Sequence, residues 1–351
     1  MKKLLFLLIL LGAKNLISQN TKPVNSEIDR YINTIQSKNN IPGVALAVIK
    51  NKKIIHKKFY GKSNLDYNIP VKEKTLFPLF STSKIFATVA IHILIQDGKI
   101  SLDDRISKYL NDLPDKWGNR TIQNLITHSS GLPEIAVYER EPEEVAKEKV
   151  YKDSIRFNPG KKFDYNQTNF WLLNRLFHQR MGVNLAEYIM QTQFSEKEPN
   201  ALFEGNSLAV VKNRATSYSD YPTKGFLRET NYNNPPYLYG ASGFNSTLDS
   251  FIVWNKRFDN NEFLNAESKK RLFTPYQYKV PRPFVNGWYM EELNDHTSYY
   301  FTGSFSTGFK KFPDKELTII FLTNGSQALL SVNKIMNHIA GLVDLELVVD
   351  D

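Results

Sequence analysis

The sequence contains no cysteine among its 351 residues. Structural disulfides, a thiol nucleophile and a lipid-modified cysteine at a processed N-terminus are therefore excluded. Histidine is also scarce, and no spacing typical of metal ligands is found among His56, His92, His178, His296 and His338. A zinc hydrolase is accordingly not expected, and neither is any metal or cofactor.

Apolar runs long enough to cross a membrane are also missing. The segment from Leu4 to Leu11 is uninterrupted and follows Lys2 and Lys3, an arrangement typical of a secretory signal. We expect a signal peptide over residues 1–18, cleaved after Ser18, and export to the periplasm or the medium. Because the segment is too short to span a bilayer, a retained membrane anchor is the weaker alternative.

Acidic residues are outnumbered, with 36 Asp and Glu against 45 Lys and Arg, which gives a formal charge of +9. Loss of Lys2, Lys3 and Lys14 with the signal peptide would lower this charge from +9 to +6. Attraction to an anionic surface such as a cell envelope is one interpretation. The densest basic cluster, over residues 50–58, is split by two isoleucines in a predicted hairpin, which favours an ordinary solvated face. No motif supports a nucleic-acid partner.

The order of periodic segments predicts an α/β (α+β) fold. Strand patterns occur at both ends of the chain, and helical patterns separated by loops occupy its middle. We expect an antiparallel sheet flanked by helices and built from both chain ends, with the helical region as an inserted lobe. The α/β lobe is assigned to residues 19–84 and 285–351, and the mainly helical lobe to residues 85–284. The expected strands are 44–49, 53–60, 286–293, 297–305 and 317–322; the expected helices are 26–39, a short one from 101, 169–181 and 327–342.

The strongest chemical signal is Ser81, followed one helical turn later by Lys84. The run from Ile85 to Ile95 has only two polar residues, so it predicts a helix buried on most sides. Ser81 would lie at the N-terminus of this helix, where free N–H groups and the helix dipole favour a developing negative charge. Lys84 would lie on the same face and, if partly desolvated, could take the serine proton. A capping serine without a catalytic role is the common alternative.

Ser-x-x-Lys spacing alone is weak, because it recurs at Ser331 and Lys334, where the start of a solvated C-terminal helix is the better interpretation. The context of Ser81 is different. After it come residues 125–133 (LITHSSGLP) and residues 159–170 (PGKKFDYNQTNF), and no comparable segments follow Ser331.

These three motifs, in this order, resemble the serine β-lactamase and penicillin-binding-protein superfamily, in its class C-like branch with carboxypeptidases and esterases. The resemblance extends from Ile41 to Gly325 and implies a β-lactamase/transpeptidase-like fold. It implies attack by Ser81 on an ester or amide carbonyl and an acyl-enzyme intermediate. It also makes Tyr165 the candidate general base or proton shuttle, which requires a cation such as Lys84 near its phenol. Aromatic packing is the alternative role for this tyrosine.

Two positions depart from the family pattern. Gln167 stands where the family has asparagine, and Phe301 stands where the third motif, Lys-Thr-Gly or His-x-Gly, has its cation. Thr302 and Gly303 complete that motif, and the glycine would let a substrate approach closely. The backbone N–H of Ser304 would pair with that of the nucleophile in an oxyanion hole.

Phe301 cannot hold a carboxylate, whereas penicillins, cephalosporins and peptides ending in D-Ala all present one. Loss of a charged hydrogen bond costs about 1.5–3 kcal/mol, so we expect a less anionic substrate, with Lys310 or Lys311 as a substitute cation. We predict an exported serine hydrolase of the esterase or amidase type, acting on small-molecule esters, amides or peptides, cell-wall peptides included. The alternatives are a D-alanyl-D-alanine carboxypeptidase or weak β-lactamase, and a non-catalytic binding protein. The resemblance also implies that the stretch containing His128 shapes the helical lobe rather than performing catalysis.

Overall fold

The computed structural model describes residues 23–194, 200–221, 223, 226–304, 306–326 and 331–349. The expected signal peptide, residues 1–18, lies outside the described residues. Within them, no helix is both long enough and apolar enough to cross a bilayer.

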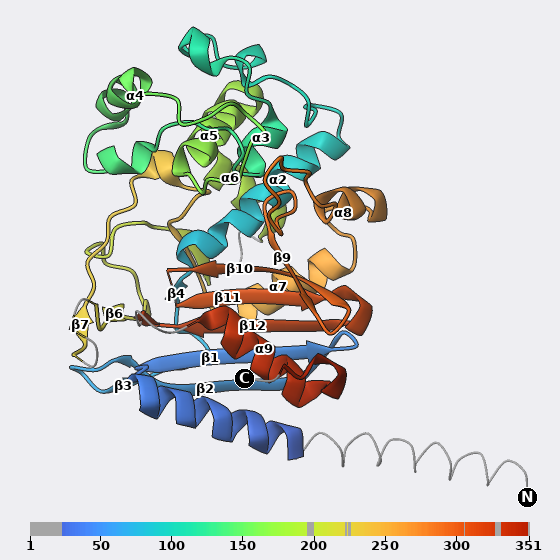
Figure 1. Cartoon of the computed structure of the whole chain (residues 1–351). Helices are drawn as coiled ribbons and strands as arrows, with labels where there is room; N and C mark the ends of the chain where they lie inside the picture. Colours follow the sequence, from blue (N-terminus) through green and yellow to red (C-terminus); the bar gives the residue numbers. More distant parts are fainter. Residues whose placement is uncertain are drawn as a thin grey trace, which may run out of the picture.

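A seven-stranded antiparallel sheet forms the base of the molecule (Figure 1). In sheet order its strands are β3 (Ile69–Pro70), β2 (Lys53–Asn64), β1 (Gly43–Lys50), β12 (Leu317–Thr323), β11 (Thr307–Phe312), β10 (His296–Gly303) and β9 (Tyr289–Leu293). Strands from the two chain ends meet in the middle, because β1 pairs with β2 on one side and with β12 on the other. In the β1–β12 register, Val44 lies opposite Thr323.

Helices cover both faces of the sheet, which explains why β1 is apolar from Val44 to Ile49. Side chains of a strand point alternately to opposite faces. Every second residue from Val44 packs in a cluster with a helix over residues 23–39 and with α9 (Val332–Val343). The residues between them, from Ala45, pack in a larger cluster that includes α2 (Lys84–Gln96) and α7 (Leu248–Asp259).

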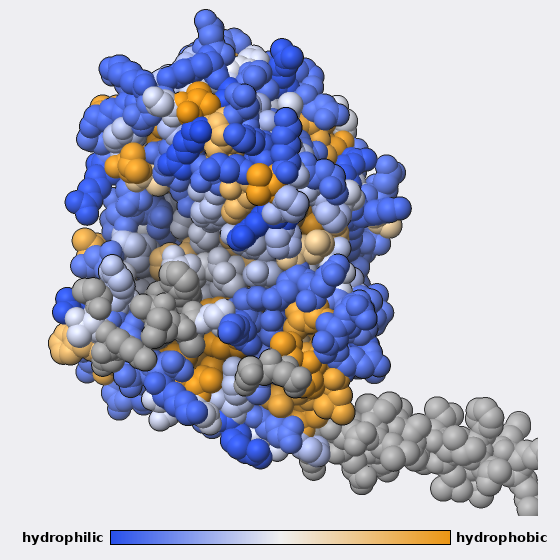
Figure 2. Space-filling view, in the orientation of Figure 1, coloured by the Kyte–Doolittle hydropathy of each residue, from blue (hydrophilic) through white to orange (hydrophobic). Residues whose placement is uncertain are grey.

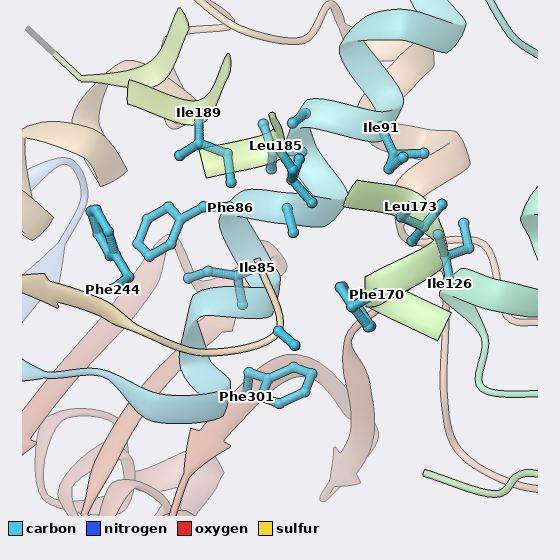
Figure 3. Packing of buried hydrophobic residues seen from close by; sticks show 14 of the residues in the cluster. Ile85, Phe86, Ile91, Ile126, Phe170, Leu173, Leu185, Ile189, Phe244 and Phe301 are labelled. Atoms are coloured by element: carbon cyan, nitrogen blue, oxygen red, sulfur yellow. The ribbon is translucent and has the colours of Figure 1, made fainter. Parts of the chain in front are cut away.

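The helix predicted after Ser81 is α2, and it is buried on most sides as expected. Two of its polar side chains bond to the backbone of the same helix: Thr88 donates to the carbonyl oxygen of Lys84, and His92 Nδ1 bonds to the carbonyl oxygen of Thr88. Figure 3 shows Ile85 and Phe86 of this helix among side chains from several other elements. α2 is therefore the centre of the larger hydrophobic cluster.

The remaining helices lie mostly above the sheet in Figure 1. They are α3 (Ile122–Ile126), α4 (Glu143–Lys152), α5 (Gln167–Met181), α6 (Leu185–Gln193) and α8 (Ala266–Leu272). Two small sheets complete the described part of the fold. One has the order β4 (Phe77–Pro78), β8 (Phe244–Ser246), β5 (Ala201–Phe203), and the other β13 (Gly325–Ser326), β6 (Tyr218–Ser219), β7 (Arg228–Glu229).

The predicted fold class is confirmed by the antiparallel sheet and its flanking helices. The structure also differs from the expectation at three places. The strand β11 had no predicted counterpart, and the helix expected from residue 101 is only a 3-10 turn, η2 (Ile106–Lys108). The lobe division remains a prediction, and α7, assigned to the helical lobe, packs against β1 and β12 of the sheet.

The second Ser-x-x-Lys segment has the structural role predicted for it. Ser331 is the N-cap of α9, and its hydroxyl accepts a hydrogen bond of 3.3 Å from the backbone N–H of Lys334.

The face of the molecule in Figure 2 is mostly hydrophilic, and hydrophobic residues gather near α9 and the chain that follows it. Leu345, Val348 and Val349 are exposed in that segment.

Candidate active site

Ser81 lies in the 3-10 turn η1 (Phe80–Ser83), which connects β4 to α2. We expected Ser81 at the N-terminus of α2 itself, whereas it lies in a turn that precedes this helix. The turn begins with Phe80, which has a φ of 47°. This left-handed conformation costs a bulky residue roughly 1–2 kcal/mol. The ring of Phe80 packs edge-on against Tyr232, with centroids 5.0 Å apart, which holds the turn in place. Ser81 is half-buried and lines a cleft of about 300 Å³.

Lys84 begins α2 and is fully buried beside the serine. Its Nζ lies 3.5 Å from Oγ of Ser81 and donates a 2.7 Å hydrogen bond to the carbonyl oxygen of Ala241. Burial lowers the pKa of Lys84 to about 7, and the carboxylate of Glu134 opposes part of this shift. At neutral pH both protonation states of the amine are populated, and the neutral form can accept a proton.

Tyr165 comes from the segment before α5 and lies against the same lysine. The centre of its ring is 4.8 Å from Nζ of Lys84, so a cation lies at the phenol as the sequence argument required. The buried hydroxyl of Tyr165 has no hydrogen-bond partner among the described residues. Burial raises the pKa of Tyr165, and the side chains of Ser81 and Gln167 lie close enough to lower it in part. Tyr165 is thus a neutral phenol at pH 7, suited to relaying a proton rather than to acting as the first base.

Two neighbours hold the Tyr165 ring in position. The next residue, Asn166, caps α5 by accepting a 2.8 Å hydrogen bond from the N–H of Thr168. His128 lies against Tyr165 with ring centroids 4.5 Å apart, and its Nδ1 accepts a hydrogen bond from the backbone N–H of Asn166. Burial lowers the pKa of His128 well below its ordinary value, and the charge of Lys84 lowers it further. A neutral His128 therefore positions the tyrosine and does not exchange protons.

Gln167 begins α5 and lines the cleft. Its backbone N–H donates to the carboxylate of Glu134 at 3.0 Å, which fixes the first turn of the helix. The side-chain Oε1 is buried and has no partner among the described residues. Such an atom at the wall of a cleft is an unused acceptor for a substrate N–H. The replacement of asparagine by glutamine thus keeps an amide at this wall.

Of the four site residues predicted at the end of β10 and just after it, only one lines the cleft. Ser304, which follows the strand, is exposed and lines the cleft, whereas Thr302 pairs with Gly308 and does not. Phe301, at the position where the family motif has its cation, is 1 % exposed and packs in the core rather than at the cleft. Its ring lies 6.5 Å from that of Tyr165 (Figure 3 shows it beside the start of α2).

The substitute cation expected at Lys310 or Lys311 is also not found in the cleft. Lys310 is fully buried and bonds to Glu291, and Lys311 pairs with Asp259 at 2.8 Å. Neither lysine is among the described residues that line the cleft. Both ammonium groups instead neutralise carboxylates from other elements, which makes the burial of two cations in β11 possible.

Gly303 is required by the close approach of the turn that carries Ser81. A Cβ at this position would lie 2.2 Å from the carbonyl oxygen of Leu79 and 3.0 Å from the backbone nitrogen of Thr82. Gly303→Ala is therefore expected to displace the turn and to lower the free energy of unfolding by about 1–3 kcal/mol, with a loss of activity. Urea unfolding measures the change. Gly118→Ala, where the nearest atom would be 3.5 Å away, is the control, and equal stability of the two variants would contradict the assignment.

Four contributors to the site had not been identified from the sequence, and one of them is Glu134, which bonds to the backbone N–H of Gln167. The others are Ala241, whose carbonyl holds Lys84, Tyr232, which packs on Phe80, and Glu139, which lines the cleft. None belongs to a motif, and only Gly240 and Gly243 hint at a turn around Ala241. Among the described residues, no group of three or more His, Asp or Glu side chains could hold a metal ion.

The comparisons with known proteins agree with this geometry. The family model described as Beta-lactamase matches residues 28–335. Protein flp of Staphylococcus aureus (strain MW2) is 23% identical over 321 residues, which cover 87% of this chain and 64% of that protein. The D-aminopeptidase of Brucella canis is 24% identical over 279 residues, 76% of this chain and 52% of that protein. This chain thus spans less than two thirds of either relative.

A solved structure shows the same fold. The D-amino acid amidase from Ochrobactrum anthropi SV3 superposes with a TM-score of 0.75. The alignment covers 92% of this chain and 99% of the amidase, at 14% sequence identity.

Proposed function

Because the chain belongs to the beta-lactamase family, we propose that it is a serine hydrolase that cleaves esters or amides through an acyl-enzyme on Ser81. One observation carries the proposal. The Ser81 hydroxyl, in a cleft, lies 3.5 Å from the amine of Lys84, which is buried and has a pKa of about 7. Relatives named as a D-aminopeptidase and a D-amino acid amidase support amide cleavage.

Acylation begins when the neutral amine of Lys84 takes the proton of Ser81 Oγ. The oxygen bonds to the carbonyl carbon of the substrate, and the π electrons of the carbonyl move to its oxygen. The backbone N–H groups of Ser81 and Ser304, two residues that line the cleft, stabilise this oxyanion. Tyr165 then relays the proton from the Lys84 ammonium to the leaving oxygen or nitrogen, as the bond from that atom to the carbonyl carbon breaks.

Deacylation repeats these steps with water as the nucleophile. Water attacks the carbonyl carbon of the acyl-Ser81 ester and gives up a proton through Tyr165 to Lys84. The tetrahedral intermediate collapses with cleavage of the bond to Ser81 Oγ, and this oxygen recovers a proton from Lys84. A carboxylic acid is released, and the three side chains return to their starting protonation states.

The substrate that we propose is a small ester or amide. A cleft of about 300 Å³ is at the lower end of the range for ligand pockets, roughly 300–1,000 Å³. No lysine or arginine is among the described residues that line the cleft, which disfavours the alternatives of a D-alanyl-D-alanine carboxypeptidase or a weak β-lactamase. A non-catalytic binding protein is the alternative from another class, and it gives no reason for a lysine with a lowered pKa beside a serine.

We further propose that the protein is exported to the periplasm or secreted. The support is the apolar segment from Leu4 to Leu11 behind Lys2 and Lys3. In that compartment, small cell-wall peptides would be within reach as substrates.

A fluorophosphonate probe tests the proposed chemistry. It phosphonylates an activated serine, so we expect one adduct, located by mass spectrometry on the peptide that contains Ser81. Ser81→Ala should carry no adduct. Ser331→Ala is the matched control, because it removes the serine of the second Ser-x-x-Lys segment, a helix cap, and should be labelled at Ser81 like the parent. A folded protein without an adduct on Ser81 would favour the binding protein.

A further inference from the structure

The charges around the cleft are unbalanced. Glu139 is the one charged side chain among the described residues that line it, and the others are polar and uncharged or apolar. A second carboxylate, Glu134, lies next to the site and bonds to the first turn of α5. The cleft is therefore negative at its wall, in contrast to a site built to receive a carboxylate.

Glu139 has no counterion within the described structure. It is half-buried at the C-cap of η4 (Ile135–Tyr138), and its carboxylate makes no ion pair or hydrogen bond there. Burial raises the pKa of the Glu139 carboxyl, the neighbouring Arg140 lowers it, and Glu134 raises it further. A partly desolvated carboxylate beside a second one is stabilised when a cation binds to it.

Among the described residues, the lysines and the arginine nearest the site do not supply this charge. Lys84 donates to Ala241 and is needed by the serine, while Lys310 and Lys311 are paired with carboxylates elsewhere. Arg140 is exposed and forms no ion pair with Glu139. Within the described structure, the unpaired carboxylate thus shares a small cleft with the nucleophile, where a molecule that enters can bring a positive charge.

We propose that Glu139 is a subsite for a protonated amine, and that the preferred acyl donors are aminoacyl esters or amides with a free ammonium group near the scissile carbonyl. The inference rests on the proposed function and names its substrate class. In a cleft of about 300 Å³, a compact ligand places the two groups only a few bonds apart. Binding at Glu139 would then also orient the carbonyl toward Ser81.

Paired substrates test the subsite. For D- and L-phenylalanine p-nitroanilide and p-nitrophenyl esters, kcat/KM is compared with that of the N-acetyl derivatives, which lack the charge. We expect the parent to prefer the free amine by about tenfold or more, and Glu139→Gln to reduce this ratio by about tenfold. Glu139→Lys should reverse the preference. Glu141→Gln is the control, because this carboxylate pairs with Lys149 outside the cleft, and its ratio should match that of the parent.

A second measurement does not depend on turnover. Phenylalaninamide should slow fluorophosphonate labelling of Ser81 more strongly than N-acetylphenylalaninamide does in the parent, and this difference should disappear in Glu139→Gln. If Ser81 is labelled but neither the kinetic ratio nor the protection depends on Glu139, the subsite is refuted and the hydrolase stands. Preference for a carboxylate-bearing substrate such as nitrocefin would refute it as well. If Ser81 is never labelled, the proposed function itself fails, and the subsite with it.

Discussion

Replacing Lys84 with methionine is expected to lower kcat/KM for a neutral ester by about 10⁴-fold and to leave the protein folded. Methionine matches the length of the buried side chain without an amine, so the acceptor of the serine proton is lost and the packing is kept. The amine of Lys84 bonds to Ser81 and Ala241 and to no carboxylate. The free energy of unfolding should therefore stay within about 1 kcal/mol, because relief from burying a cation offsets the lost hydrogen bond.

The pH dependence separates this role from a merely structural one. Burial lowers the pKa of Lys84 to about 7, so below that pH the side chain is an ammonium, which cannot accept a proton. In the parent, kcat/KM should fall by about tenfold per pH unit below 7 and level off above it. Lys84→Met should lose this acidic limb. If Lys84→Met kept the acidic limb of the pH profile or the rate of the parent, Lys84 would not be the base.

Lys311→Met is the matched control for a buried lysine. Lys311 pairs with Asp259, and its removal leaves a carboxylate that keeps 25% of its side chain exposed. We expect a loss of about 3 kcal/mol in the free energy of unfolding, the low end for a broken buried pair. The kcat/KM of the folded fraction should be close to that of the parent. Lys84→Met is thus predicted to lose activity and keep its stability, whereas Lys311→Met is predicted to lose stability and keep its activity.

Tyr165→Phe is expected to lower kcat by about 10²- to 10³-fold, because only the relaying hydroxyl is removed. That hydroxyl is buried and has no partner among the described residues, so its loss should not destabilise the protein and should raise the free energy of unfolding by up to about 1 kcal/mol. Steady-state kinetics and urea unfolding of the same samples measure both effects. An unchanged kcat would make Tyr165 a packing residue.

Tyr278→Phe is the control for Tyr165→Phe, because it should lower stability and leave the rate unchanged. The buried hydroxyl of Tyr278 donates a 2.6 Å hydrogen bond to the carbonyl oxygen of Thr127, and this residue does not line the cleft. Its removal leaves a buried acceptor without its donor and should lower the free energy of unfolding by about 1 kcal/mol. The rate should be unaffected. A lower rate in this variant would mean that any phenol removed from this region disturbs the site.

Most of the sheet was predictable from the sequence because its strands carry a local signal. β1 and β12 are short apolar runs between turns, and their places at opposite ends of the chain indicated that the ends pair. β11 carries no such signal, since Lys310 and Lys311 interrupt its apolar residues. These lysines can be buried only because Glu291 and Asp259 reach them from β9 and α7, contacts that a sequence pattern does not contain.

The site was predictable where its residues are neighbours in the sequence or belong to a motif. Ser81 and Lys84 are three positions apart, so helical geometry alone brings them within reach. The orientation of Phe301 could not be derived in this way, because it depends on which face of β10 meets the core. Glu139 has no motif at all, and its relevance follows only from the cleft that it shares with Ser81.

The pairing of β1 with β12 has a consequence for the timing of folding. Val44 and Thr323, which face each other, are separated by nearly the whole chain, and such distant contacts slow folding. Leu79, just before the turn of Ser81, is held by Thr307 of β11, which itself pairs with β12. A nascent chain therefore cannot assemble the nucleophile until the ribosome has released the last strands. On the proposed function, we expect hydrolysis only after the sheet is complete, so chains that end before β12 should be inert.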